Sequence, residues 1–336
     1  MSALVSIIMP AYNAAGWIRR AIDSVLQQSW PAVEMIVVDD GSTDSTGEVC
    51  RTYGERIRYI RQDNSGVSTA RNNGIAHATG DFIGFLDSDD EYLPDMISSL
   101  MGVLEKYPQA GIASGAFLMV RPNAQKRCPE PGKVLGGRES GIISDFYRLS
   151  LDSAIAWTGA VLVRKAVLDA VGLFRPDLRL GEDLELWYRI AGKYQWACLD
   201  KTVALYHNNP ASSVTCHSRS LPKLNWLYGE EEMRLRVRPE LWESYRSFRD
   251  YWILRTSKDM IWMLAGREAR QTLRLTSPGG RGARWRFLNA LSWCPGWLLG
   301  GLRMAAMVRS RFVDWRLTRK CRRDPAASRL PGAGEG

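Results

Sequence analysis

Residues 82–95 read FIGFLDSDDEYLPD, an apolar run typical of a buried strand that passes without a break into acidic side chains. Four carboxylates, those of Asp87, Asp89, Asp90 and Glu91, stand within five positions. Crowding like charges at a strand end raises the free-energy cost of ionising each group. A bound divalent cation relieves that repulsion through its own charge, so the stretch predicts a strand whose carboxyl end carries a cation site. The alternative is a solvated acidic loop followed by a helix start, with Pro94 and Asp95 as turn and cap residues.

Strand and helix patterns alternate on both sides of this stretch. Continuous apolar, β-branched runs at 4–9 and 34–40 and a weaker one at 57–62 predict strands, and apolar residues at helical spacing between 18 and 26 predict a helix. Such alternation is typical of an α/β domain with a Rossmann-like, mostly parallel sheet and flanking helices. After about residue 218 strand patterns fade, so we expect a first domain at 1–217 and a helical region at 218–336.

In open α/β sheets, ligands bind beyond the carboxyl ends of the strands. This rule gathers residues 10–13, 39–42 and 87–90 on one rim, although they lie far apart in the sequence. On that rim Tyr12 is placed to stack on a base and Asp40 to accept a hydrogen bond from a base N–H group. The simpler alternatives are that Tyr12 packs and that Asp40 shapes the turn with Gly41.

A divalent metal reconciles an acidic rim with a nucleotide site. Two carboxylates spaced D-x-D can hold a hard cation that also takes pyrophosphate oxygens. The first strand is not followed by G-x-G-x-x-G, and no GxxxxGK[ST] occurs, which disfavours dinucleotide-binding enzymes and P-loop chemistry.

Four segments together resemble a known family: VSIIMPAYNAAGWIRRAIDSVLQQSW, EMIVVDDGSTDST, NSGVSTARNNGIAHATGDFIGFLDSDDEYLPD and GEDLELWYRI. In this order they resemble the inverting family-2 glycosyltransferases with the GT-A fold, over about residues 4–210. The resemblance implies transfer of a sugar from a nucleotide-diphosphate donor, with a UDP-sugar favoured, to a hydroxyl of a glycan or lipid-linked acceptor in surface polysaccharide synthesis. The alternative is a catalytically silent sugar-nucleotide or glycan-binding subunit of a polysaccharide assembly.

The resemblance also implies a role for individual residues. Around the nucleotide it implies Pro10, Tyr12, Asp40 and Arg71. It implies a DxD pair of Asp87 and Asp89, with Asp89 the preferred direct ligand of Mn²⁺ or Mg²⁺. As catalytic base it implies Asp183, with Glu182 beside it. His207, which follows a predicted strand, is a further candidate near the metal and diphosphate, although a lone histidine is more often structural.

The basic charge of the chain is concentrated at its C-terminal end. Residues 276–336 contain eleven Arg and one Lys against three acidic residues, which accounts for the whole formal net charge of +9. The Trp, Leu and Arg mixture at 281–323 predicts in-plane attachment to an anionic membrane surface, with acceptor contacts. The alternatives are a spanning or re-entrant helix at 287–308 and a solvated basic bundle. No base-reading module accompanies the charge, so nucleic acid is not expected as a partner.

Cysteine usage and the N-terminus bear on the compartment. The six cysteines are widely spaced and form no CxxC pair, which suits a reducing compartment. The N-terminal residues do not form a signal-peptide pattern. We therefore expect a cytoplasmic enzyme, peripheral at the inner face of the cell membrane.

Overall fold

The computed structural model describes residues 2–121, 124–128, 135–151, 155–178, 180–207, 230–263 and 265–294. The chain forms two compact units, Met1–Tyr251 and Trp252–Gly336. The predicted boundary at 217/218 lies outside the described residues. The helical segment from Glu230 to Tyr251 belongs to the first unit, together with the α/β part.

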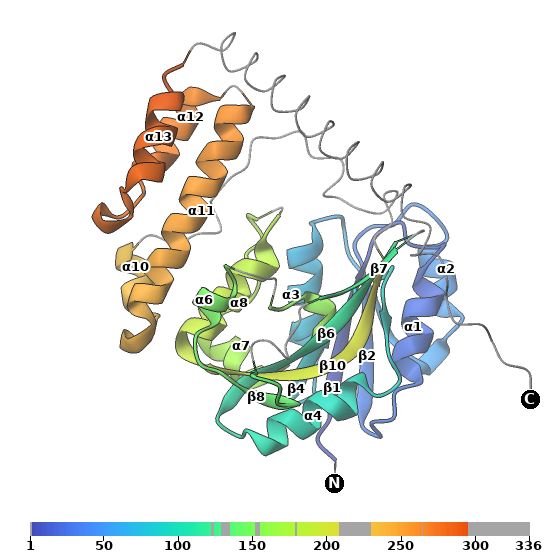
Figure 1. The fold of residues 1–336 in the computed structure, drawn as a ribbon. Coiled ribbons are helices and arrows are strands. Elements are labelled where there is room, and N and C mark those ends of the chain that lie inside the picture. Colours follow the sequence, from blue (N-terminus) through green and yellow to red (C-terminus); the bar gives the residue numbers. More distant parts are fainter. Residues whose placement is uncertain are drawn as a thin grey trace, which may run out of the picture. The chain divides into compact units, whose positions relative to one another are not determined.

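The first unit is built on one ten-stranded sheet with the order β3-β2-β1-β4-β9-β6-β10-β5, to which β7 adds on β6 and β8 on β10. The N-terminal part is parallel throughout (Figure 1). Its strands are β1 (Val5–Ala11), β2 (Val33–Asp39), β3 (Arg58–Arg61) and β4 (Phe82–Phe85). Each falls on a run that the apolar pattern predicts, because buried parallel strands are apolar on both faces.

The second part of the sheet is mixed rather than mostly parallel. Strand β9 (Val161–Arg164) runs antiparallel to both of its neighbours, β4 and β6. Beyond it, β6 (Ala110–Arg121) pairs in parallel with the long β10 (Gln195–His207). Three short strands complete the sheet in antiparallel pairings: β5 (Glu91–Tyr92), β7 (Ala124–Cys128) and β8 (Ser140–Ile143). The α/β class with flanking helices is confirmed, and the purely parallel character is limited to β1–β4.

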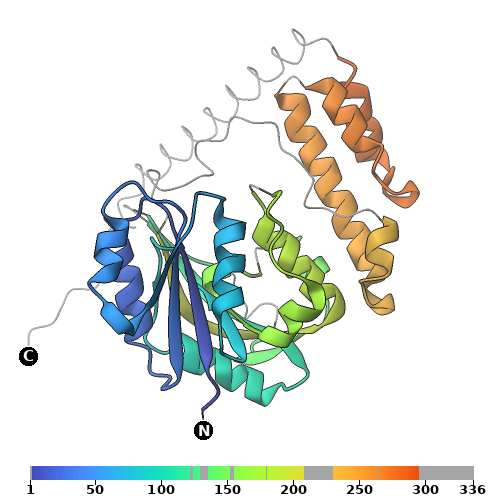
Figure 2. The same ribbon diagram turned by 180° about the vertical axis from the view of Figure 1, so that it is seen from behind.

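Helices cover both faces of the sheet (Figures 1 and 2). Alternate residues of β1 point to opposite faces, so Ile7 and Met9 join a core with α1 (Ile18–Leu26) and α4 (Met96–Lys106). On the other face α3 (Val67–His77) approaches the sheet so closely that a Cβ at Gly74 would lie 2.3 Å from Ile8 Cγ2. The remaining helices of this α/β part are α2 (Thr46–Arg51), α6 (Phe146–Leu149), α7 (Lys165–Val171) and α8 (Glu182–Lys193), with single 3-10 turns at η1 (Gly54–Arg56) and η2 (Thr158–Ala160).

Aromatic packing joins the end of the first unit to its α/β part. Tyr147 of α6 donates a hydrogen bond from its hydroxyl to the carbonyl oxygen of Tyr188 at 2.9 Å. The ring of Tyr188 packs on Phe248 with centroids 4.4 Å apart, and Phe248 is fully buried. Phe248 lies in α11 (Trp242–Trp262), which follows α10 (Glu230–Arg234) and η3 (Pro239–Leu241). This packing explains why the segment up to Tyr251 belongs to the first unit.

The described part of the second unit continues with α12 (Gly266–Leu273), η4 (Pro278–Gly280) and α13 (Ala283–Leu291). Its core is small and includes Leu254, Ile261, Leu273 and Leu288. Among the described residues, no helix combines the length and the apolar content that a membrane crossing requires. Most of the predicted membrane segment 287–308 lies outside the described residues.

Candidate active site

The strand order places β1 between β2 and β4, so the carboxyl ends of these three strands form one rim. Pro10 lies at the point where β1 loses its partner on the β4 side. The last bond of that ladder runs from the Leu86 amide to the Ile8 carbonyl, and residues two apart on a strand face the same neighbour. An N–H group at position 10 would therefore point past the end of β4 and find no partner in the sheet. Proline, which has no N–H group, costs no hydrogen bond at this position.

The loop after β1 is fixed against the loop after β2. Asn13 has a positive φ of 49°, a left-handed conformation that is uncommon for a residue other than glycine. Its amide donates to Ser42 Oγ at 3.0 Å, and its side-chain oxygen accepts from the Thr43 amide at 2.8 Å. Tyr12 stands beside this turn with 52% of its surface exposed, so it is not a packing residue.

Asp40 lies on the predicted rim, but its carboxylate is engaged by the chain itself. Oδ1 accepts from the side-chain amide of Gln62 and from the Ser65 amide, and Oδ2 accepts from the Gly66 amide, each at 2.8 Å. These bonds hold the loop that leads into α3. Asp40 therefore orders this loop in the structure.

Arg71 brings together the two acidic segments that the sequence singled out. Its guanidinium donates from Nη2 to Asp87 Oδ1 at 2.8 Å and from Nη1 to Glu182 Oε1 at 2.9 Å. Arg71 is only 3% exposed, and its planar group lies 5.2 Å from the centre of the Phe174 ring. Burial lowers the pKa of Arg71, but Asp87 and Glu182 outweigh it and raise the pKa above its ordinary value. The arginine is therefore a permanent buried cation between the end of β4 and the start of α8.

Helix α8 presents Glu182 and Asp183 at its N-terminus. The preceding Gly181 has a φ of 79°, which turns the chain into the helix. Burial raises the pKa of Glu182, the neighbouring Asp183 raises it further, and Arg71 opposes both effects. Asp183 is held from two sides: Oδ1 accepts from the Leu184 amide at 2.7 Å, and Oδ2 accepts from the hydroxyl of Thr158 at 3.2 Å.

The third acid of the opening stretch is buried. Asp90 is inaccessible to solvent, and its Oδ1 accepts from the His207 amide at 2.8 Å at the end of β10. Its Oδ2 is buried with no hydrogen-bond partner among the described residues. Burial raises the pKa of Asp90 well above its ordinary value, and the charges of Asp87 and Asp89 raise it further.

His207 contributes its backbone to Asp90, and its ring lies beside Glu91. The ring Nε2 is 3.4 Å from Glu91 Oε2. Burial lowers the pKa of His207, as does nearby Arg20, while Glu91 and Asp89 oppose the change. Arg20 of α1 donates to the backbone oxygen of Asp89, so it helps to fix the loop between β4 and β5.

A divalent cation suits the chemistry of this loop, although its ligands are not all supplied by the protein. Within the described part of the chain, no group of three or more His, Cys, Asp or Glu side chains is arranged to hold a metal ion. Magnesium-type ions are commonly held by one or two carboxylates plus substrate phosphates. Asp87 and Asp89 provide such oxygens, and the raising of the pKa of Asp90 by their charges reflects the crowding of negative charge that a cation would offset.

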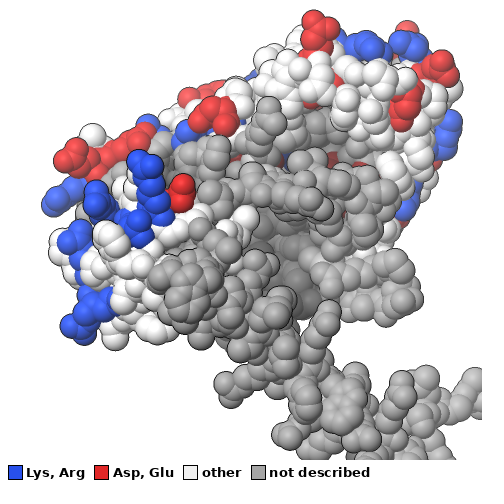
Figure 3. All heavy atoms as spheres, turned by 90° about the horizontal axis from the view of Figure 1, so that it is seen from above, with Lys and Arg blue, Asp and Glu red and all other residues white. Residues whose placement is uncertain are grey.

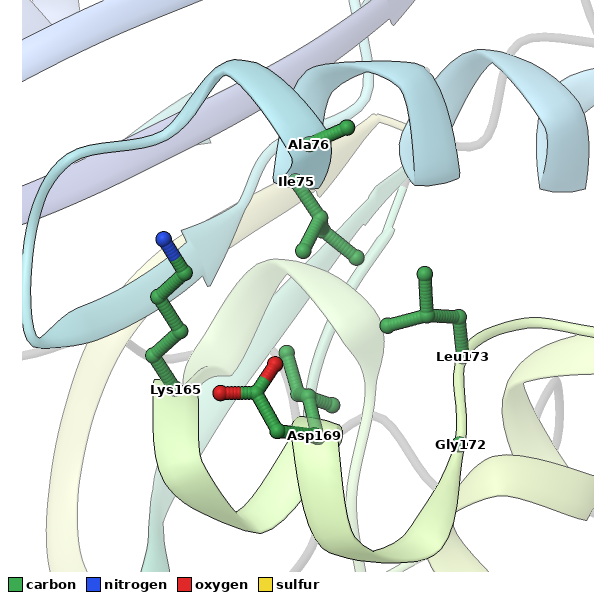
Figure 4. Close-up of a pocket in the computed structure, with 7 residues that line it drawn as sticks. Ile75, Ala76, Lys165, Asp169, Gly172 and Leu173 are labelled. Carbon is green, nitrogen blue, oxygen red and sulfur yellow. The ribbon is translucent and has the colours of Figure 1, made fainter.

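A cavity of about 400 Å³ lies elsewhere, between α3 and α7 (Figure 4). Its lining consists of Ile75, Ala76, Lys165, Leu168, Asp169, Gly172 and Leu173. No predicted site residue lines it, and Lys165 uses its ammonium group to bond the Ala78 carbonyl at 2.6 Å. We therefore place the candidate site at the acidic rim and not in this cavity.

Sequence reasoning placed Asn13 on the rim but missed its role in the turn, and it missed Thr158 and the structural role of Asp90. The signal for Asn13 was an Asn followed by Ala-Ala after a strand, which is compatible with a turn but not diagnostic. Asp90 belongs to the acidic cluster, yet nothing local predicts that β10 buries it. Thr158 meets Asp183 only through the tertiary fold, because 25 positions separate them.

The family model and two relatives that match this chain are all described as glycosyltransferases. Residues 6–134 match the family model described as Glycosyl transferase family 2. An uncharacterized glycosyltransferase of Rickettsia prowazekii is 32% identical over 190 residues, which cover 56% of this chain and 58% of that protein. The glycosyltransferase YibD of Escherichia coli is 28% identical over 283 residues, covering 76% of this chain and 81% of its own. The chain thus spans little more than half of the length of the Rickettsia relative.

Solved structures show the same fold. Chains of S. aureus TarS superpose with TM-scores of 0.61 and 0.56 at 17% and 18% identity, covering 86% and 85% of this chain and 53% and 90% of theirs. One of these TarS structures is a complex with UDP-GlcNAc, and another similar TarS chain is a complex with UDP. At this level of identity the likeness establishes a GT-A fold.

Proposed function

Because the chain belongs to the family-2 glycosyltransferases, we propose that it moves a sugar from a nucleotide-diphosphate donor to a hydroxyl group of a glycan or lipid-linked acceptor, with inversion at the anomeric carbon. A UDP-sugar is the favoured donor. The UDP and UDP-GlcNAc complexes of TarS, which shares the fold, support this choice. Surface polysaccharide synthesis at the inner face of the cell membrane is the proposed setting.

One observation carries the proposal: a single buried arginine joins Asp87 to Glu182, residues that belong to different elements of the fold. Inverting transfer needs a base on one side of the sugar and stabilisation of the leaving diphosphate on the other side. The Arg71 bridge fixes the segments that carry these two functions in one arrangement. A solvated acidic loop and an ordinary helix start would not need a fully buried cation between them.

On the acceptor side, Asp183 removes the proton from the attacking hydroxyl. Thr158 and the Leu184 amide each bond one of its oxygens, which restrains the carboxylate in one orientation. Each carboxylate oxygen has a second lone pair, so Asp183 can still accept a proton while it keeps both bonds. Glu182 turns toward Arg71 and is therefore a positioning residue rather than a second base.

On the donor side, Tyr12 is exposed for stacking on the base, and Pro10, two positions before it at the end of β1, would lie beside the nucleotide. Asp87 and Asp89 would hold a Mn²⁺ or Mg²⁺ ion, with His207 near them. Such an ion, when bound, supplies positive charge that offsets the charge of a departing diphosphate. Arg71 bonds one oxygen of Asp87 and so restrains its carboxylate at the end of β4.

Substitution of the base tests the proposal. Asp183→Asn preserves shape and removes the basic group, so turnover with a UDP-sugar should fall by about 10² to 10⁴, the usual contribution of a general base. Binding of UDP with Mn²⁺, measured by calorimetry, should stay unchanged. Turnover within a few fold of the wild type would show that Asp183 is not the base. A wild type that binds UDP-sugars and never transfers or hydrolyses them would favour the alternative, a silent binding subunit.

A further inference from the structure

The outward side of the α12–α13 hairpin has an unusual surface for a soluble helix pair. The inward side of α13 packs Leu288 into the small core, and Trp285 donates from its indole to the Leu273 carbonyl at 3.0 Å. At about 100° per residue, Arg286 and Ala290 lie nearly opposite Leu288 on α13, and Phe287 lies on the flank between these two sides. Phe287 is 64% exposed, and Trp293, just past the helix end, is 69% exposed. Two large aromatic side chains are thus presented to solvent close together along the chain.

The same hairpin is strongly basic. Residues 265–294 contain six arginines and a single acidic residue, Glu268, which gives a formal charge of +5. Five of the arginines are exposed: Arg267, Arg274, Arg281, Arg284 and Arg286. Figure 3 shows one face of the molecule, on which Lys and Arg side chains gather at the left edge.

Arginine and aromatic side chains are interleaved in space as well as in sequence. The guanidinium of Arg270 lies 4.1 Å from the centre of the Trp293 ring, and Arg270 also donates to the Ser292 carbonyl. Trp293 is therefore restrained in its exposed position instead of folding back on the core. A cation held against an exposed indole is the arrangement expected where lipid phosphates meet the apolar part of a bilayer.

We propose that this hairpin is a docking surface for an anionic lipid bilayer, with Phe287 and Trp293 entering the headgroup region and the exposed arginines meeting lipid phosphates. A protein partner would have to bring a dense acidic patch that also accepts two aromatic side chains, whereas an anionic bilayer offers both properties at once. The sequence after Cys294 is also rich in Trp, Leu and Arg. This inference goes beyond sugar transfer and does not depend on it.

Flotation of the full-length chain tests the proposal. Vesicles of phosphatidylcholine with about one third phosphatidylglycerol are compared with pure phosphatidylcholine, at low and at high salt. We expect the chain to float with the anionic vesicles at low salt and to remain at the bottom with neutral ones. Arg284→Gln with Arg286→Gln should weaken partitioning about 25-fold, at about fivefold for each basic residue near an anionic surface. Phe287→Ser with Trp293→Ser should weaken it by at least about tenfold and reduce the binding that survives in salt.

Matched controls come from exposed residues of the first unit. Arg51→Gln with Arg58→Gln removes the same charge, and Leu235→Ser removes a side chain that is 92% exposed. Both should float like the wild type. All substituted side chains are exposed, and thermal unfolding verifies that each variant is folded.

Three results would overturn the proposal. The first is a wild type that stays at the bottom of the gradient with anionic vesicles at low salt. The second is a set of hairpin variants that float as well as the controls. The third is a wild type that binds a single-stranded oligonucleotide but no vesicles, with oligonucleotide binding lost in the hairpin variants. Transfer to a soluble acceptor is measured in parallel, and it should be unchanged in the hairpin variants.

Discussion

The guanidinium of Arg71 and the carboxylate of Glu182 meet at 2.9 Å, although 111 positions separate them in the sequence. Both side chains are largely buried, and the same guanidinium bonds Asp87. A planar group with parallel donors can serve two carboxylates at once, which a lysine ammonium cannot do with the same geometry. The relationship makes the acidic loop and the start of α8 parts of one electrostatic unit.

Replacing Arg71 should therefore destabilise the protein strongly. Arg71→Met leaves a buried carboxylate without its counter-charge and should lower the free energy of unfolding by about 3–5 kcal/mol. The free energy of unfolding of Arg71→Lys should lie between those of Arg71→Met and the wild type. Urea denaturation measures the series. Arg175→Met, which breaks the ion pair with Asp177 at the surface, is the control and should lower the free energy of unfolding by less than about 1 kcal/mol. Equal midpoints for Arg71→Met and Arg175→Met would contradict the bridge.

Glu182 should make stability depend on pH in a defined direction. Its folded-state pKa is raised above the ordinary 4.5, chiefly by burial and then by Asp183. The folded chain thus holds this proton more tightly than the unfolded chain, so stability is present below that ordinary value and is lost as the pH rises through the raised pKa. In Glu182→Gln the side chain at position 182 no longer titrates. The melting temperature of this variant minus that of the wild type should therefore rise from about pH 4 to about pH 8. A difference that stays constant over this range would contradict a raised pKa for Glu182.

Asp40 should affect stability as well as donor binding. Asp40→Ala removes three hydrogen bonds to the loop before α3, and at about 1 kcal/mol each the free energy of unfolding should fall by about 3 kcal/mol. Asp63→Ala, an exposed acid of the same loop, is the control and should change little. If Asp40→Ala weakened UDP binding with no loss of stability, the residue would act on the base alone.

Asp89 is expected to link the metal to the nucleotide. Calorimetry of UDP binding should show a higher affinity in the presence of Mn²⁺ than in its absence for the wild type. In Asp89→Asn this gain in affinity should be at least about tenfold smaller. Asp81→Asn, at the other end of β4, is exposed and should behave like the wild type. A wild type whose UDP affinity is indifferent to both Mn²⁺ and Mg²⁺ would contradict a metal role for this loop.

Thr158 should act on the reaction through Asp183. Its hydroxyl holds Oδ2 of Asp183, so Thr158→Val should free the carboxylate to leave its orientation and lower kcat. The donor KM should stay unchanged. Thr158→Ser keeps the hydroxyl and should restore kcat. A Ser variant as slow as the Val variant would indicate a packing effect instead.

The sequence predicted best those features that depend on local pattern. The runs at 4–9, 34–40 and 82–86 became β1, β2 and β4, because a strand buried on both faces needs an unbroken apolar run. The rule that ligands gather at the carboxyl ends of parallel strands correctly brought Tyr12, Asp40 and Asp87 to one rim. The direction of β9 and the existence of the two-residue strand β5 could not be predicted from the sequence, because strand pairing and direction depend on connections far along the chain.

The same limit applies to the candidate site. Motifs pointed to Arg71, Asp87 and Glu182 separately, but only the fold shows that they share one ion-pair network. The pattern of its turn predicted that Asp40 contacts the base of the nucleotide. The structure shows in addition three hydrogen bonds that Asp40 accepts from its own chain, which no local pattern reveals. Burial of Asp90 depends on β10, which begins more than 100 positions later.

The late position of β10 has a consequence for how a nascent chain matures on the ribosome. Strands β1 to β4 are complete at Phe85, whereas Asp90 meets the His207 amide only when β10 has been synthesised and docks. Until then the acid stays hydrated and charged. Docking of β10 therefore dehydrates a carboxylate late in folding, so we expect mild acidity or divalent cations to speed this closing step and to leave assembly of the first four strands unaffected.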